Sequence, residues 1–171
     1  MPHTPGGTGS TQLPSLYLDF IERHGASEWD CGDDLVFLWG GEQLIPFNDE
    51  YRVQTLTPGL ILIGSDGSGE AFGFDLRLAQ RPVVQVPFVG MNRKYMNAVA
   101  KDFGEWKAML KPRQDSDSHP GMQLAEVNPV LFGGDTVDPA NRVWLTRSQH
   151  FEYVRFWNNV FLLASSKSTP Q

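Results

Sequence analysis

The most informative pattern of apolar and polar positions lies between Leu60 and Arg77. An unbroken apolar run covers Leu60–Ile63, which is typical of a strand buried on both faces. A glycine-rich polar hinge follows it. Beyond the hinge, Phe72, Phe74 and Leu76 share one face of a second segment with strand period. Two such segments joined by a short turn predict a β-hairpin.

The hinge favours a structural turn over a ligand loop. Glycines allow positive φ, and Asp66 favours a local turn. A phosphate-binding loop would need Lys and then Ser or Thr after Gly69, but Glu70 and Ala71 follow. The dinucleotide, calcium-loop and nucleophile-elbow patterns also fail at single positions. We therefore assign a structural role in the hairpin to Gly64, Ser65, Asp66, Gly67, Gly69, Glu70 and Asp75.

Hydrophobic periodicity predicts the remaining elements. Helical spacing with terminal signals predicts a helix over 14–24, and another over 97–110 with an apolar stripe. The pattern from Thr146 to Gln149 is that of a capping box and predicts the start of a last helix. Strands are expected at 34–39, at 82–86 and within 128–134, with one helical turn at 47–51. Together these elements predict an α+β domain with a mostly antiparallel sheet, flanked by helices that cover one face of the sheet.

The hairpin resembles a known family. The pattern Ile63-Gly-Ser-Asp-Gly-Ser-Gly-Glu70, followed by Phe74-Asp75-Leu76-Arg77, is similar to that of the SUKH superfamily of Smi/Knr-like domains. The pair Phe103 and Trp106 agrees with it. That superfamily holds many bacterial immunity proteins and a fungal regulator of cell-wall synthesis. The resemblance implies a SUKH-like fold, and it says little about activity.

The resemblance also divides the chain. We expect a disordered leader over 1–12, a SUKH-like core over 13–110 and a linker or loop over 111–122. A C-terminal extension over 123–165 would pack its helix on the core, and a disordered tail would cover 166–171.

Charge and composition limit the classes of partner. The chain has 171 residues, a net charge of −6 and a pI of about 5.1, which disfavours nucleic acid and anionic membranes and permits a basic protein. No apolar run is long enough to span a membrane, and residues 1–10 do not read as a signal peptide. Cys31 is the only cysteine. The simplest expectation is a cytoplasmic protein without cofactor or metal.

The stretch 27–50 is the best candidate for a partner surface. It carries seven acidic residues and no Lys or Arg, with aromatic residues between them. One interpretation is a solvated loop and the edges of a strand, with the aromatic residues in the core. The other is an acidic surface with aromatic anchors that captures a basic partner. The candidate contact residues are Trp29, Asp30, Asp33, Asp34, Asp49, Glu50 and Tyr51.

Three hypotheses of function follow. The first is a non-enzymatic immunity protein that binds and neutralises a cognate toxin, such as a basic nuclease. The second is a regulatory or scaffold protein of the same superfamily. The third is a hydrolase that uses Asp66, Glu70 or Asp75, which requires these carboxylates to converge in a pocket. A thiol site at Cys31 is disfavoured because nearby carboxylates oppose the thiolate. The sequence predicts no oligomeric state.

Overall fold

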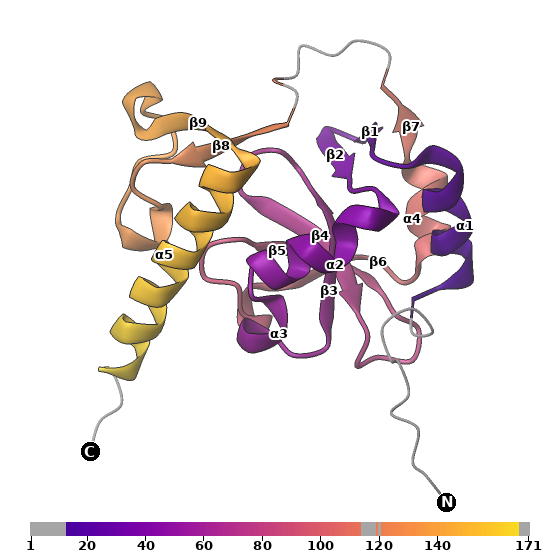
Figure 1. Ribbon diagram of the computed structural model, residues 1–171, viewed down its shortest axis with the longest axis horizontal. Coiled ribbons are helices and arrows are strands. Elements are labelled where there is room, and N and C mark those ends of the chain that lie inside the picture. Colours follow the sequence, from indigo (N-terminus) through magenta and orange to yellow (C-terminus); the bar gives the residue numbers. More distant parts are fainter. Residues whose placement is uncertain (1–12, 114–118, 120, 168–171) are drawn as a thin grey trace, which may run out of the picture.

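The described residues form one antiparallel sheet of seven strands and a second sheet of two strands. Figure 1 presents the computed structural model, which describes residues 13–113, 119 and 121–167. The predicted leader 1–12, residues 114–118 and 120 of the predicted linker, and tail residues 168–171 lie outside these ranges. The strand order of the large sheet is β6-β5-β4-β3-β2-β1-β7, and the small sheet pairs β8 with β9. The predicted α+β class is therefore confirmed.

The elements have the following bounds. The strands are β1 Ser27–Cys31, β2 Asp34–Leu38, β3 Leu60–Ser65, β4 Glu70–Asp75, β5 Val83–Pro87, β6 Asn97–Ala100, β7 Lys111–Pro112, β8 Met122–Glu126 and β9 Arg142–Thr146. The α-helices are α1 Ser15–His24, α2 Gly41–Glu50, α3 Val53–Leu56, α4 Phe103–Met109 and α5 Arg147–Ser166. Short 3₁₀ turns are η1 Arg93–Tyr95, η2 Val130–Phe132 and η3 Pro139–Asn141.

The predicted hairpin lies at the centre of the sheet as β3 and β4. Leu60 pairs with Asp75 and Ser65 pairs with Ala71, with one register shift between Leu62 and Gly64. The Asp66 carboxylate accepts hydrogen bonds from the backbone N–H groups of Ser68 and Glu70, so the turn is held by its own side chain. The hinge is thus a turn between two paired strands.

Helices lie on both faces of the sheet, whereas we expected them on one face. All residues of β4 from Ala71 to Asp75 are buried, and neighbouring side chains on a strand point to opposite faces. On one face, the ring of Phe74 meets Tyr17 of α1 and Phe103 of α4. Elsewhere α2 and α3 pack against β3 (Figure 1), and the Asn48 amide of α2 forms two hydrogen bonds of 2.8 Å with the β3 backbone. The core therefore lies on both sides of the hairpin.

The segment 97–110 is a strand and a short helix, which corrects the single helix that we predicted. Residues Asn97–Ala100 pair with β5 at the edge of the sheet. The helix begins only after Asp102, whose side chain accepts a 2.8 Å hydrogen bond from the Glu105 backbone N–H. Asp102 and Glu105 have the spacing of a capping box, which is the sequence signal that marks this start.

Three further expectations were wrong in detail. Residues 128–134 hold the turn η2 instead of a strand, because Pro129 precedes it and Glu126 accepts a hydrogen bond from the Val130 backbone N–H. The acidic segment Ser27–Cys31 is a strand, and Lys111–Pro112, placed in the linker, pairs with it. The helical turn at 47–51 is the end of the ten-residue helix α2.

The C-terminal segment packs on the core through side chains and backbone. Thr146 and Gln149 form the predicted capping box at the start of α5, and Phe151 and Val154 of that helix join the core cluster. Strand β8 is tied to the hairpin: the Ser65 hydroxyl donates to Gln123 at 3.0 Å. Helix α5 thus lies beside the large sheet (Figure 1), and a concave surface forms between them.

Candidate functional site

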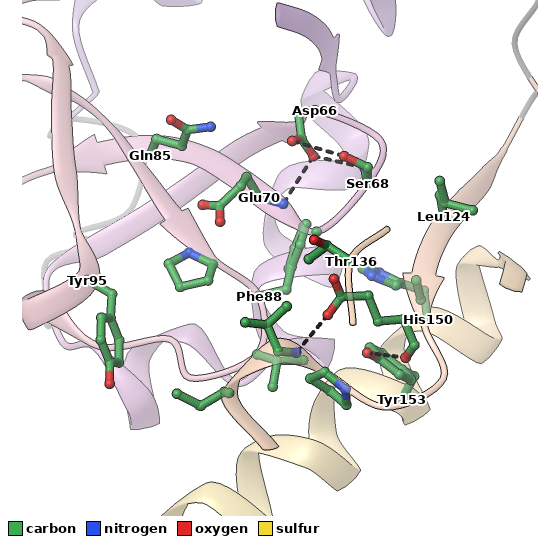
Figure 2. Close-up of a pocket in the computed structure, with 18 of the residues that line it drawn as sticks. Asp66, Ser68, Glu70, Gln85, Phe88, Tyr95, Leu124, Thr136, His150 and Tyr153 are labelled. Carbon is green, nitrogen blue, oxygen red and sulfur yellow. Dashed lines mark hydrogen bonds between the residues drawn. The ribbon is translucent and has the colours of Figure 1, made fainter. Parts of the chain in front are cut away.

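A cleft of about 610 Å³ separates the core sheet from the C-terminal segment. Its walls come from the β3–β4 turn, the end of β5, η1, β8, η2 and α5 (Figure 2). The volume is in the range of known binding pockets. The cleft exists only because elements far apart in the sequence meet here.

Hydrogen bonds on two sides of the cleft hold its walls together. At the hairpin turn, the Leu124 backbone N–H donates to the Gly67 carbonyl at 2.9 Å. At the loop after β5, the buried Asn158 amide of α5 donates to the Phe88 carbonyl at 2.9 Å and accepts from the Gly90 N–H at 2.7 Å. The two walls are thus fixed relative to each other at both ends.

Glu70 is a lining carboxylate whose pKa is raised by its surroundings. Burial, together with the negative charge of Asp66, raises its pKa to about 7. Figure 2 shows its carboxylate directed away from Asp66 and into the open space. Asp66 itself is engaged in the turn, because its two oxygens accept hydrogen bonds from Ser68 and from the Glu70 backbone. Glu70 is therefore the acidic group that faces the cleft with its charge uncompensated.

The polar groups of the opposite wall form hydrogen bonds with one another. The Tyr153 hydroxyl donates to the Glu126 carbonyl at 2.7 Å, and the Glu126 carboxylate accepts from the Val130 N–H at 2.8 Å. Burial raises the pKa of Tyr153, and burial, with the nearby Arg147, lowers the pKa of His150 to about 3. Both side chains are thus neutral near pH 7. This wall adds the charge of Glu126 alone.

An exposed apolar rim completes the cleft. Tyr95 on η1 is 36% exposed, and Val130 and Leu131 on η2 are 53% and 41% exposed. Large apolar side chains gathered at the mouth of a concave surface are typical of a contact with another molecule. The cleft therefore combines an acidic floor with an apolar rim.

The predicted acidic surface is only partly available. Asp33 and Asp34 are exposed at the β1–β2 turn, and Asp49 is exposed near the end of α2. Glu50 forms an ion pair with Arg155, and Asp30 lies 3.9 Å from Arg113. These contacts already neutralise part of the charge that we assigned to a partner.

The two aromatic anchors that we predicted lie in the core. Tyr51 is fully buried, and Trp29 is 9% exposed and packs against Phe20. Trp29 faces inward because side chains alternate along the short strand β1. Tyr51 follows the end of α2 and contacts Phe88 and Phe151. Neither ring is positioned to contact a partner.

The carboxylates of the hydrolase hypothesis do not converge. Asp66 and Glu70 line the cleft, but Asp75 pairs with Arg93 at 2.9 Å and accepts from the Arg77 backbone N–H. Asp75 therefore serves as the partner of an ion pair beside the sheet. Since Asp66 is engaged in the turn, Glu70 stands alone and forms no acid–base pair with the other two. Within the described ranges, no three His, Cys, Asp or Glu side chains gather as a metal site.

Cys31 is a poor nucleophile. Burial raises the pKa of its thiol, and the charge of Asp34 raises it further. The expected effect of acidic neighbours on this thiol is confirmed, although burial is the larger cause.

Comparison with known families decides the identity of the core. The sequence profile described as the SMI1/KNR4 family (SUKH-1) matches residues 10–109. The chain belongs to this family. No curated protein matches it. In the described part of this SUKH-1 chain, the longest apolar helices are too short or too polar to cross a membrane.

The cleft of this SUKH-1 protein draws on residues that sequence reasoning missed. The match ends at residue 109, yet β8, η2 and α5 build one wall. The lining residues Glu126, Leu131, His150 and Tyr153 belong to no motif identified in the sequence. The strand Met122–Glu126 buries Gln123 and Ala125 and leaves Met122 and Leu124 only partly buried, so its apolar positions were no guide to that wall.

Proposed function

We propose that this SUKH-1 protein is a non-enzymatic immunity protein that binds a basic bacterial toxin domain and blocks it. The observation that carries the proposal is the set of exposed carboxylates at Asp33, Asp34 and Asp49. Three ion pairs form among the described residues, and none includes these side chains. Their charge is therefore available to another molecule.

The charge of the whole chain supports a basic partner. A net charge of −6 repels nucleic acid and attracts cationic protein surfaces. A nuclease toxin fits because an active site that binds phosphates is basic. Complementary charge raises the association rate, which favours rapid capture of a harmful enzyme. This role places the protein in the cytoplasm of the bacterial cell that it protects.

A regulatory or scaffold role is the alternative within the same superfamily. It shares the binding chemistry and differs in the partner. Genome neighbourhood separates the two, because an immunity gene lies beside its toxin gene.

The test is protection of growth. The toxin domain encoded beside this gene is expressed with and without the chain, and survival is compared. A catalytically dead toxin controls for the burden of expression. The proposal predicts that growth is restored by the wild-type chain; continued killing at equal expression, with soluble folded protein, would overturn it.

The acidic side chains are tested in the same assay. Asp33→Lys with Asp34→Lys should abolish protection. The matched control is Asp19→Lys with Glu22→Lys, which makes the same change of charge on exposed positions of α1. Equal loss in both variants would mean that only net charge matters and would remove the β1–β2 turn from the interface.

A further inference from the structure

We propose that the cleft between the core and the C-terminal segment is a second docking site, which receives an arginine- or lysine-bearing loop of the partner protein. The proposal rests on the proposed function for the partner's identity as a basic protein. It adds a site outside the predicted acidic surface, built in part by a segment beyond the family match.

The rim of the cleft is shaped for a polypeptide. The cleft has a volume of about 610 Å³, and the partly exposed apolar side chains of Tyr95, Val130 and Leu131 line it. The aliphatic stem of an arginine or lysine can lie on such a rim while its charged end enters. A small metal ion would leave these apolar side chains uncovered, so a protein loop fits the cleft better.

The charge inside the cleft is complementary to such a side chain. Three carboxylates line it, on Asp66, Glu70 and Glu126, and no described lining residue is Lys or Arg. Cationic side chains lie beside the cleft without lining it. The Arg142 guanidinium donates to the Thr136 carbonyl at the rim, and the Lys94 ammonium lies 4.8 Å from the Tyr95 ring centre.

Glu70 is the carboxylate whose ionised form a bound cation would stabilise most. The sequence buries its carboxylate beside Asp66, and both effects oppose its ionisation. An entering guanidinium would pair with the ionised carboxylate of Glu70 and so lower its pKa again. Of the lining groups on α5, His150 stays neutral and Tyr153 is bonded to Glu126. The positive charges near the cleft are those of Arg147 beside His150, Arg142 and Lys94.

Firm walls make the site ready for binding. Hydrogen bonds from Asn158 and Leu124 fix α5 and β8 to the core on two sides of the opening. On binding, the partner side chain would lose conformational entropy, but the cleft is already ordered and would lose little. A smaller entropy cost favours affinity.

The test uses short peptides as probes and needs no toxin. The capped peptide acetyl-Gly-Arg-Gly-amide is titrated into the full chain and followed by amide signals in ¹H–¹⁵N spectra. The neutral control is the same peptide with citrulline, which keeps the shape of arginine and removes its charge. We expect shifts at Glu70, Val89 and Leu131, and binding at least about tenfold weaker for the citrulline peptide.

Two variants locate the binding. Glu70→Gln keeps the size of the side chain and should weaken arginine-peptide binding about tenfold. Glu22→Gln makes the same change at an exposed position of α1 and should leave binding unchanged. Binding should also strengthen as the pH rises from 6 to 8, because Glu70 ionises across this range.

Several results would overturn the proposal. These are equal binding of the citrulline peptide, shifts confined to the β1–β2 turn, or no shifts with a folded chain. The proposed function would survive each of them, since protection from the toxin is measured separately. Conversely, arginine-peptide binding at the cleft with no protection of growth would sustain the site and overturn the immunity role.

Discussion

The Tyr51 hydroxyl lies 2.6 Å from Nδ1 of His150, although 99 residues separate them in the sequence. Arg147 donates to the same hydroxyl at 3.1 Å, and an arginine can only donate. We infer that the hydroxyl, which accepts from Arg147, donates its own proton to Nδ1, and this places the imidazole proton on Nε2. The lowered pKa of His150 agrees with this neutral form. This contact joins the C-terminal helix to the SUKH-1 core.

Removing that hydroxyl should destabilise the protein. Tyr51→Phe leaves buried His150 without its hydrogen-bond donor and Arg147 without an acceptor. We expect a loss of about 1–3 kcal/mol in the free energy of unfolding. Urea denaturation at pH 7 measures it. The control is Tyr95→Phe, where the ring is 36% exposed, and this change should cost less than about 0.5 kcal/mol. Equal costs in both variants would mean that the buried bond contributes nothing.

The core should depend on α5 despite its position beyond the family match. Phe151 is 9% exposed and packs on Phe47 and Tyr51. Phe151→Ala should cost about 3–5 kcal/mol, because it leaves a cavity in the core. Phe156→Ala on the same helix is the matched control, since this ring is 59% exposed. If thermal and urea unfolding showed the same small change for both, α5 would not be part of the core.

The second strand of the hairpin should tolerate no side chain at Gly73. A Cβ there would lie 2.3 Å from the Ile61 carbonyl oxygen, which belongs to the backbone and cannot move aside cheaply. Gly73→Ala should therefore cost about 2–3 kcal/mol. Gly41→Ala is the control, because no heavy atom lies within 4 Å of its Cβ and Ala favours a helix. Unfolding curves that fail to separate the two would contradict this close packing of β3 and β4.

Stability should decrease as the pH rises through the titration of Glu70. Its pKa is about 7 in the folded chain and 4.5 as an ordinary glutamate, so the folded state holds the proton more tightly. Folding stability from this group is full below pH 4.5 and is lost as the pH rises to about 7. Allowing for its partial exposure, ionisation costs roughly 1–2 kcal/mol.

The Glu70→Gln variant isolates this effect. It should be more stable than the wild type at pH 8 by that amount and equal to it near pH 4.5. The difference between the two proteins is the right measure, because His150 acts in the opposite direction below pH 6.5 in both. Asp49→Asn serves as the control. A difference that does not change with pH would contradict the burial of Glu70.

The hairpin could be predicted because its signals are local. The Asp66 turn and the positive-φ glycines are set by neighbours in the chain, and so is the Thr146–Gln149 cap of α5. Each needs only a few residues to form. The same holds for the fold family, whose motif lies within one hairpin.

The strands β1 and β9 could not be predicted, because tertiary pairing decides them. β1 is acidic and becomes a strand by pairing with β2 and β7, and β9 is largely exposed and pairs with β8. The contact of Tyr51 with His150 has no local signal either. The cleft could not be predicted from the sequence either, because it forms where the hairpin meets a segment that begins after residue 120.

The burial of Tyr51 and Trp29 changes the predicted interface more than any other finding. Aromatic residues next to carboxylates suggested anchors with charge around them. Both rings stabilise the core instead, and the carboxylates of the β1–β2 turn remain as the exposed part of that pattern.

The dissociation constant between this chain and a basic toxin domain, where one is encoded beside its gene, tests the central claim most directly. It should be measured by calorimetry at two salt concentrations for the wild type, for Asp33→Asn with Asp34→Asn, and for the control Asp19→Asn with Glu22→Gln. We predict tight binding that weakens with salt, about a tenfold loss for the β1–β2 turn variant, and little change for the control. Absence of binding by the folded wild-type chain would contradict the account.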